Sequence, residues 1–356
     1  MRSATSPGAA TAWVASLSPW PEEFGLDGMR SLLARLGDPQ KAYPAVHVVG
    51  TNGKSTATRT IAELLGSEGL RVGAYTSPHV AGWHERLNCD EAGFERAVAR
   101  VRGPAEELGS TQFEVLTAAA LLEFAEQGVD AAVVEAGLGG RLDATNVVNA
   151  EVVLLTNVAL EHTEVLGETR EEIAQEKLAV AHAARVVVMS DNTFERLVPG
   201  DAAIVLGGAR EAAEAFLGRK IEHDADVSLA GRLERRDGEI RDGAHTPEAV
   251  EWLLARIPAR DYVLCVSILR EKRVDELLER LGRAGSTFVA TTSSNPRALP
   301  AKDLAAQAAA HFSEVLSVAD PAKALARART FGRPVLVTGS LYLLADLHAR
   351  EEDAAG

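Results

Sequence analysis

The sequence predicts an α/β protein with mostly parallel sheets, divided into two domains. Short, continuously apolar runs alternate along the chain with stretches that have helical spacing. Continuous hydrophobicity is typical of parallel strands that are covered on both faces. Polar residues follow several of these runs, and a glycine-rich turn with a lysine follows one of them. At 356 residues the chain is also longer than most single domains.

The composition limits the classes of function. A net charge of -14 argues against non-specific nucleic-acid binding, which needs an excess of lysine and arginine. Hydrophobic residues make up 46% and charged residues 25%, as in ordinary soluble proteins. Cys89 and Cys265 lie far apart without metal-ligand spacing, which indicates neither a disulfide framework nor a zinc site. We expect a cytoplasmic protein with neither a signal peptide nor a membrane partner.

The N-terminal part begins with a lead-in, residues 1–21, that we expect to be loose or partly helical. Leu32, Leu33 and Leu36 then form one face of a helix that stops at Gly37. After the strand at 45–49 and the helix that follows it, the expected strands are 70–76, 129–136, 152–156 and 185–189. The expected helices between them are 113–125 and 170–183.

The pattern weakens between residues 190 and 229, where only a short helix at 210–217 is expected. We place the domain boundary there, with one domain at 1–229 and a smaller α/β domain at 230–356. The second domain has expected strands at 262–268, 287–292, 315–318 and 334–338. Near its start, Thr246 is expected to cap a helix that has Pro247 in its first position.

The segment AVHVVGTNGKS, residues 45–55, has the features of a phosphate-binding turn. Glycines let several backbone N–H groups point inward, Lys54 adds a positive charge, and the following helix begins with the hydroxyls of Ser55 and Thr56. The general P-loop pattern has a further glycine where this chain has Val48, so only the shorter G-x-x-G-K-S form is present. The alternative is a glycine-rich turn that binds no ligand.

Polar residues after the other strands are expected to meet at the same sheet edge. Ser77 follows one strand, Glu135 ends another, and Asn157 and His162 follow a third. Open parallel sheets bind ligands beyond the carboxyl ends of their strands, so these segments predict one pocket. Each residue also has a structural alternative: Glu135 as a salt-bridged or solvent-facing strand end, His162 as a structural histidine, and Lys177 as a solvated helix residue.

Together these motifs resemble the folylpolyglutamate synthase/dihydrofolate synthase family of the Mur ligase superfamily. The resemblance rests, in order, on HVVGTNGKST, GAYTSPHVAGWHERLN, VVEAGLGGRLDATNVV, LEHTEVLGETREEIAQEKLAV, LAGRLE, RDGAHTPEAV and GSLYLLADL. It covers roughly residues 24–189 and 231–344. Thr246 stands where the family usually has Asn, Glu161 where it has Asp, and Ser55 where it has Gly. The family's Gln-x-x-Asn-Ala segment for adenine is not found between residues 190 and 229.

The resemblance implies an ATP- and Mg²⁺-dependent ligase with an ATP-binding P-loop domain at 1–229 and a Rossmann-like domain at 230–356. It also assigns roles to residues of this chain. Lys54, Lys177 and His162 would be catalytic. Ser55, Ser77, Glu135, His162 and a carbamylated Lys177 would hold magnesium. The residues expected to bind ATP are Thr51, Asn52, Gly53, Lys54, Ser55, Thr56, Arg232, Asp242 and His245.

The implied reaction joins L-glutamate to a folate or dihydropteroate through an acyl phosphate. It needs positioning and charge neutralisation and no protein nucleophile. One alternative is a related ligase that acts on another carboxylate, and another is a shortened paralogue that binds a nucleotide or folate without turnover. The expected partners are small molecules, and the expected protein is a monomer.

Overall fold

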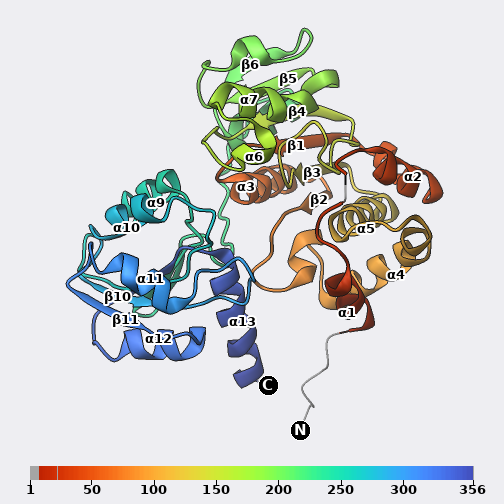
Figure 1. The fold of residues 1–356 in the computed structure, drawn as a ribbon. Coiled ribbons are helices and arrows are strands. Elements are labelled where there is room, and N and C mark those ends of the chain that lie inside the picture. Colours follow the sequence, from red (N-terminus) through yellow and green to blue (C-terminus); the bar gives the residue numbers. More distant parts are fainter. Residues whose placement is uncertain (1–7, 22, 356) are drawn as a thin grey trace. The chain divides into compact units, whose positions relative to one another are not determined.

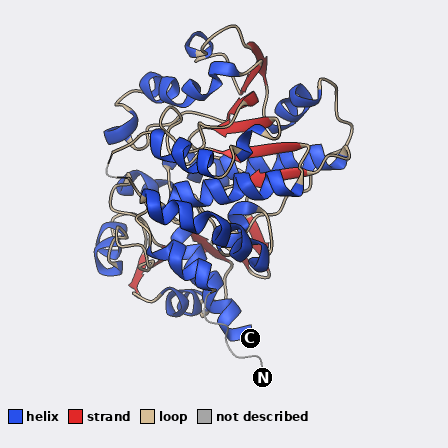
Figure 2. Ribbon diagram, turned by 90° about the vertical axis from the view of Figure 1, so that its right-hand side faces the viewer, coloured by secondary structure: helices blue, strands red, loops and turns tan. Residues whose placement is uncertain are grey.

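The computed structural model describes residues 8–21 and 23–355, the side chains of 353–355 excepted, and it comprises two compact α/β units (Figure 1). The first unit contains most residues up to 227. The second contains residues 228–355 together with residues 79–82. Helices flank the strands in both units (Figure 2). The α/β class expected from the alternating pattern is confirmed.

The first unit is built on a six-stranded parallel sheet in the order β2-β3-β1-β4-β5-β6. Its strands are β1 (Ala45–Val49), β2 (Val72–Tyr75), β3 (Ala131–Glu135), β4 (Ala150–Leu155), β5 (Val186–Met189) and β6 (Ala203–Leu206). The strand β1, which precedes the glycine-rich turn, lies between β3 and β4. The turn therefore leaves the middle of the sheet, with other strand ends on both sides.

Helices cover both faces of this sheet, and the pleat of β1 assigns its residues to one face or the other. Ala45 and Val49 join the core formed with α1, α2, α4 and α5, whereas Val46 and Val48 join the core formed with α3 and α8. The helices of this unit are α1 (Ala9–Ser16), α2 (Asp27–Arg35), α3 (Lys54–Ser67), α4 (Glu91–Leu108), α5 (Gln112–Gln127), α6 (Thr163–Leu166), α7 (Arg170–Leu178) and α8 (Ala209–Leu217).

Two expectations about this unit needed correction. The helix expected at 170–183 ends at Leu178 and continues as a 3₁₀ helix, Ala179–Ala183, because an Ala-rich continuation does not fix which helical form is adopted. The weakly patterned stretch 190–229 contains the edge strand β6, whose partly exposed residues lack the apolar signature of the inner strands. The lead-in contains α1, in agreement with the expected partly helical segment, and residues 1–7 and 22 lie outside the described part.

The second unit contains a mixed six-stranded sheet in the order β11-β10-β9-β12-β8-β7, in which only the β7–β8 pair is antiparallel. The strands are β7 (Glu234–Arg236), β8 (Glu239–Arg241), β9 (Val263–Val266), β10 (Thr287–Ala290), β11 (Glu314–Ser317) and β12 (Val335–Thr338). The helices are α9 (Pro247–Leu254), α10 (Val274–Leu281), α11 (Ala301–Ala308), α12 (Pro321–Arg329) and α13 (Leu341–Ala355). The predicted cap of α9 is present, because the Thr246 side chain accepts a hydrogen bond from the Ala249 N–H.

Residues 79–82 belong to the second unit although they follow β2 of the first. Val80 is buried in a core cluster with Leu343 and Leu344 of α13. Gly231 lies beside them, and a Cβ there would be 3.2 Å from a Val80 methyl group. Among the described residues, no helix is both long enough and apolar enough to cross a membrane.

Candidate functional site

The glycine-rich turn between β1 and α3 has the backbone conformation that the sequence predicts. Gly53 precedes the first residue of α3 with a φ of +79°, in the left-handed region that favours glycine. Gly50 has a φ of +143°, and a Cβ there would lie 1.9 Å from Thr156 Oγ1. Because Gly53 has no side chain to cap α3, the first amides of that helix form an anion-binding end.

The loop that follows β4 fixes the shape of this turn. The Thr51 N–H donates to the Asn157 carbonyl at 3.0 Å, and the Asn52 N–H donates to Asn157 Oδ1 at 3.0 Å. Thr156 Oγ1 donates to the Asn52 carbonyl at 2.8 Å. The Ala159 N–H donates to Thr51 Oγ1 at 3.1 Å. The turn is therefore preorganised by neutral groups.

Glu135 brings two further predicted residues to this sheet edge. It is 2% exposed at the end of β3, so the solvent-facing alternative is wrong. Ser55 Oγ donates to Glu135 Oε1 at 3.1 Å, and the Ser77 N–H donates to Glu135 Oε2 at 3.0 Å. Segments from β1, β2 and β3 thus meet at one carboxylate, as expected for the carboxyl edge of a parallel sheet.

The oxygen atoms at this edge are suitable ligands for a magnesium ion. A carboxylate and serine oxygens are hard ligands, and Mg²⁺ usually takes one or two carboxylates with substrate phosphates and water. Within the described part of the chain, no cluster of three or more His, Cys, Asp or Glu side chains could hold a metal by itself. The arrangement therefore suits a metal that binds together with a nucleotide.

His162 lies in the loop before α6 with a left-handed φ of +53°. Its Nε2 is 4.0 Å from Glu161 Oε1, and its Nδ1 is 3.8 Å from Glu164 Oε1. These carboxylates keep the imidazole among negative charges. The role of His162 as a metal ligand stays a prediction.

Lys177 is buried, so the alternative of a solvated helix residue is wrong. It is 5% exposed on α7, and its Nζ donates to the Gly50 carbonyl at 2.9 Å. Burial, aided by the positive charge of Lys54, lowers the pKa of Lys177 to about 7. The lysine thus reaches the base of the phosphate turn with an amine that is partly neutral near neutral pH.

Asp143 is a buried residue of this region that sequence reasoning missed. It lies in the loop after Glu135, and burial raises its pKa although Thr145 and backbone amides donate to its carboxylate. The available signal was an acidic residue in the glycine-rich stretch GLGGRLD directly after a buried strand. The sequence does not show whether such a residue points inward.

Arg232, Asp242 and His245 lie in the second unit, close to the carboxyl end of β8. Asp242 Oδ2 accepts from the Leu233 N–H at 2.7 Å, and Oδ1 accepts from the Ala244 N–H at 2.8 Å. Burial raises the pKa of Asp242, while Arg232 and His245 oppose that effect electrostatically. The three side chains form one local group, and their contact with ATP stays a prediction.

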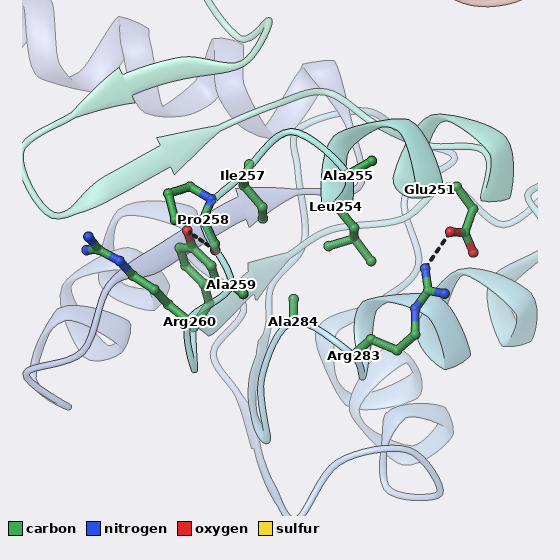
Figure 3. Close-up of a pocket in the computed structure, with 10 residues that line it drawn as sticks. Glu251, Leu254, Ala255, Ile257, Pro258, Ala259, Arg260, Arg283 and Ala284 are labelled. Carbon is green, nitrogen blue, oxygen red and sulfur yellow. Dashed lines mark hydrogen bonds and ion pairs between the residues drawn. The ribbon is translucent and has the colours of Figure 1, made fainter.

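A surface pocket of about 390 Å³ lies elsewhere in the second unit (Figure 3). Leu254, Pro258 and Ala284 line it, with the Arg283–Glu251 ion pair on one wall. Another lining residue, Tyr262, directly precedes β9, so the pocket lies at the amino end of that strand. None of the predicted site residues lines it, and we do not assign it to the predicted chemistry.

Two family models match the chain. The Mur ligase middle domain matches residues 48–230, and the Mur ligase glutamate ligase domain matches residues 231–341. A Bacillus subtilis dihydrofolate synthase/folylpolyglutamate synthase is 29% identical, over 96% of this chain and 98% of the relative. The Mycobacterium tuberculosis protein of that name is 30% identical, over 82% and 80%. A probable bifunctional folylpolyglutamate synthase/dihydropteroate synthase of Haloferax volcanii is 35% identical, but the match spans only 32% of its length.

Solved structures of such enzymes have the same fold. Mycobacterium tuberculosis folylpolyglutamate synthase complexed with ADP and AMPPCP matches with a TM-score of 0.88 and 27% identity, over 96% of this chain and 98% of that one. Escherichia coli FolC in complex with DHPP and ADP matches with a TM-score of 0.87 and 26% identity, over 99% of both chains. A Yersinia pestis bifunctional enzyme complexed with AMPPNP and Mn ion matches with a TM-score of 0.82 and 27% identity, over 98% of both.

Proposed function

The chain belongs to the Mur ligase family, and we propose that it is an ATP- and Mg²⁺-dependent ligase that adds L-glutamate to a folate, as a folylpolyglutamate synthase, a dihydrofolate synthase or both. The observation that carries the proposal is the joining of the phosphate turn to Glu135 through Ser55. Relatives that match along nearly their whole length are named for these two activities. The dihydropteroate synthase activity in the name of the Haloferax volcanii relative is not proposed here, because most of that protein lies outside the match.

The phosphate turn binds and orients the triphosphate of ATP. Amides of the turn and of the first turn of α3 donate to phosphate oxygens, and Lys54 neutralises charge near the terminal phosphate. A carboxylate of the folate or dihydropteroate then attacks the γ-phosphorus, ADP leaves, and an acyl phosphate forms. The glutamate amino group attacks the acyl carbon, phosphate leaves, the amine loses a proton, and an amide bond results.

Ser55, Ser77, Glu135 and His162 are proposed to hold magnesium. When bound, the ion supplies positive charge that offsets the negative charge on the transferring phosphoryl group. Glu135 is already fixed by hydrogen bonds from Ser55 and the Ser77 amide, so its carboxylate needs little reorganisation to receive a cation.

Lys177 is proposed to carry a carbamate that adds a metal-binding anion. Its neutral amine would attack the carbon of CO₂ and release one proton, which replaces a buried cation by an anion. Burial and the lowered pKa of Lys177 support this proposal, because only the neutral amine reacts.

We further propose that residues 1–229 form the ATP-binding domain and 230–356 the ligase domain. Arg232, Asp242 and His245 are proposed to contribute to ATP binding. A cytoplasmic monomer is proposed from the low number of cysteines and from the presence of all the predicted site residues within one chain.

The function is tested by incubating the protein with ATP, Mg²⁺ and glutamate plus tetrahydrofolate or dihydropteroate in turn. We expect ADP release that depends on glutamate and on at least one of the two acceptors. Turnover only with another carboxylate would make the chain a different Mur-type ligase. Nucleotide binding without turnover on any acceptor would contradict the proposal and favour a binding protein.

A further inference from the structure

Residues 136–146 belong to the connection between β3 and β4, and they contact α7, the helix that carries Lys177. The loop begins directly after Glu135 and approaches the backbone of α7 at Gly140. A Cβ at Gly140 would lie 2.6 Å from the Lys177 carbonyl oxygen. The Arg141 N–H donates to the Glu176 carbonyl at 3.0 Å. Any shift of this loop therefore disturbs the backbone around Lys177.

The buried carboxylate of Asp143 holds the loop closed. Its Oδ2 accepts from the Leu138 N–H at 2.7 Å near the start of the loop. Its Oδ1 accepts from the Thr145 N–H at 3.0 Å and from Thr145 Oγ1 at 2.5 Å near the end. One side chain thus links both ends of the loop across its interior.

The hydroxyl of Thr145 has a second partner inside the sheet. His47 Nε2 lies 2.8 Å from Thr145 Oγ1. His47 is fully buried in β1, on the same face as Ala45 and Val49, three residues before Gly50. A hydrogen-bonded chain therefore runs from the interior of β1 through Thr145 to Asp143.

The available protons determine which group donates in each hydrogen bond between His47, Thr145 and Asp143. Both oxygens of Asp143 accept backbone N–H bonds, so we assign the ionised carboxylate, which can only accept. Thr145 Oγ1 has a single proton, and it then donates this proton to Asp143. The hydroxyl must then accept from His47, so we assign the neutral Nε2–H tautomer. His47 Nδ1 has no hydrogen-bond partner among the described residues, which fits an unprotonated nitrogen. Burial, with a smaller effect of nearby His182, lowers the pKa of His47 to about 3.

We propose that His47 is a positioning residue of the ligase site, which through Thr145 and Asp143 holds loop 136–146 between Glu135 and Lys177. His47 itself does not touch substrate in this account. The inference rests on the proposed function for its catalytic meaning, but the hydrogen-bonded chain can be tested without turnover.

A role in positioning predicts effects that loss of stability alone does not. Groups that orient metal ligands from outside typically change metal affinity or activity about 10- to 100-fold when removed. If the loop shifts, Glu135 and Lys177 lose their relative placement, and the Mg²⁺ requirement for nucleotide binding should rise. A purely structural histidine would lower the unfolding temperature and leave the Mg²⁺ requirement of the folded fraction unchanged.

The variants are His47→Leu, which removes the donor, His47→Gln, which keeps an amide N–H near the position of Nε2, and Thr145→Val. Thr58→Val is the matched control, because Thr58 is equally buried and its Oγ1 has no partner among the described residues. Binding of AMPPCP is titrated against Mg²⁺ by calorimetry in each folded protein. The His47 tautomer of the wild type is measured by ¹⁵N NMR.

We expect His47→Leu and Thr145→Val each to raise the half-saturating Mg²⁺ concentration about 10-fold, and the double variant to add little. His47→Gln should stay within about threefold of the wild type, as should Thr58→Val.

If His47→Leu does not fold, Thr145→Val and His47→Gln still test the proposal. An unchanged Mg²⁺ requirement in Thr145→Val, or a protonated Nδ1 in the wild type, would overturn the proposal. Absent ligase activity with these binding and NMR results would refute only the proposed function.

Discussion

The buried ion cluster around Arg241 in the second unit is held differently from Glu135 and Lys177 in the first. In the first unit, Glu135 is held by Ser55 and the Ser77 amide, and Lys177 by the Gly50 carbonyl. In the second unit, Arg241 is 1% exposed and is held by the carboxylates of Glu239 and Glu351. Hydrogen bonds with neutral groups, donated or accepted, satisfy a charge without cancelling its field, whereas opposite charges largely neutralise each other.

We infer from this difference that Glu135 and Lys177 serve function and that the ion cluster around Arg241 serves stability. Charges held by neutral groups at the first sheet's carboxyl edge can still act on phosphates and a metal. The carboxyl edge of the second sheet has buried neutral hydroxyls at Ser267, Thr291 and Thr338, and its buried carboxylate, Asp242, directly follows β8. Its charged group of Arg241, Glu239 and Glu351 lies on β8 and α13, where we expect it to contribute stability.

The largest effect is expected from Lys54→Ala, which tests whether the charge at the first sheet's edge acts on phosphate. Loss of a group that stabilises transferring charge should lower kcat about 100-fold or more. Initial rates of ADP release measure the change. Lys41→Ala, at an exposed lysine bound to Asp38, is the control and should leave the rate unchanged. A Lys54→Ala protein that kept most of its activity would contradict the proposed role of the phosphate turn in catalysis.

Glu135→Gln should have the next largest effect, because it keeps the shape of the side chain and removes its charge. We expect the half-saturating Mg²⁺ concentration for activity to rise about 10-fold or more, with a smaller change at saturating metal. Magnesium titrations of the steady-state rate measure this shift. An unchanged titration would mean that Glu135 has a structural role, like the ion cluster around Arg241.

The smallest effect is expected from Glu351→Gln, on stability and with activity retained. Burial alone would raise the pKa of Glu351, but Arg241 and Arg236 hold it at about 2. The carboxylate therefore stabilises the fold above its unfolded pKa of about 4.5, and this contribution is lost as pH falls toward 2. The side chain is 37% exposed, so solvent screening limits the loss at neutral pH to about 1 kcal/mol.

Urea unfolding of the wild type and Glu351→Gln at neutral and acid pH measures this difference. It should be present at pH 7 and should shrink as the medium is acidified through pH 4. Glu352→Gln is the control, since Glu352 is more exposed and pairs with His348. A difference that grew on acidification would contradict the assigned direction.

The sequence predicted those parts whose chemistry is local. The phosphate turn follows from glycines, Lys54 and the helix after them, and the cap at Thr246 follows from its neighbour Pro247. Inner strands were predictable because both faces are buried, which makes them continuously apolar. The partly exposed edge strand β6 lacks that signature.

Burial that depends on distant segments could not be derived from local pattern. The stretch REEIAQEKL indicates a solvated helix, yet Lys177 is buried because α7 packs beside the phosphate turn. The inward orientation of the Asp143 side chain depends on a hydrogen bond from Thr145. Thr145 in turn contacts His47 on β1, which lies 98 residues earlier in the sequence. Likewise, no local feature of residues 79–82 shows that Val80 joins the core of the second unit.

The central claim is that this chain activates a substrate carboxylate by transfer of the ATP γ-phosphate. It is tested most directly by giving the protein an acceptor whose reacting carboxylate carries ¹⁸O, with ATP, Mg²⁺ and glutamate. An acyl-phosphate route predicts that each released inorganic phosphate acquires one oxygen from that carboxylate, which ³¹P NMR detects as an isotope shift. Amide product accompanied by phosphate without ¹⁸O would contradict the account.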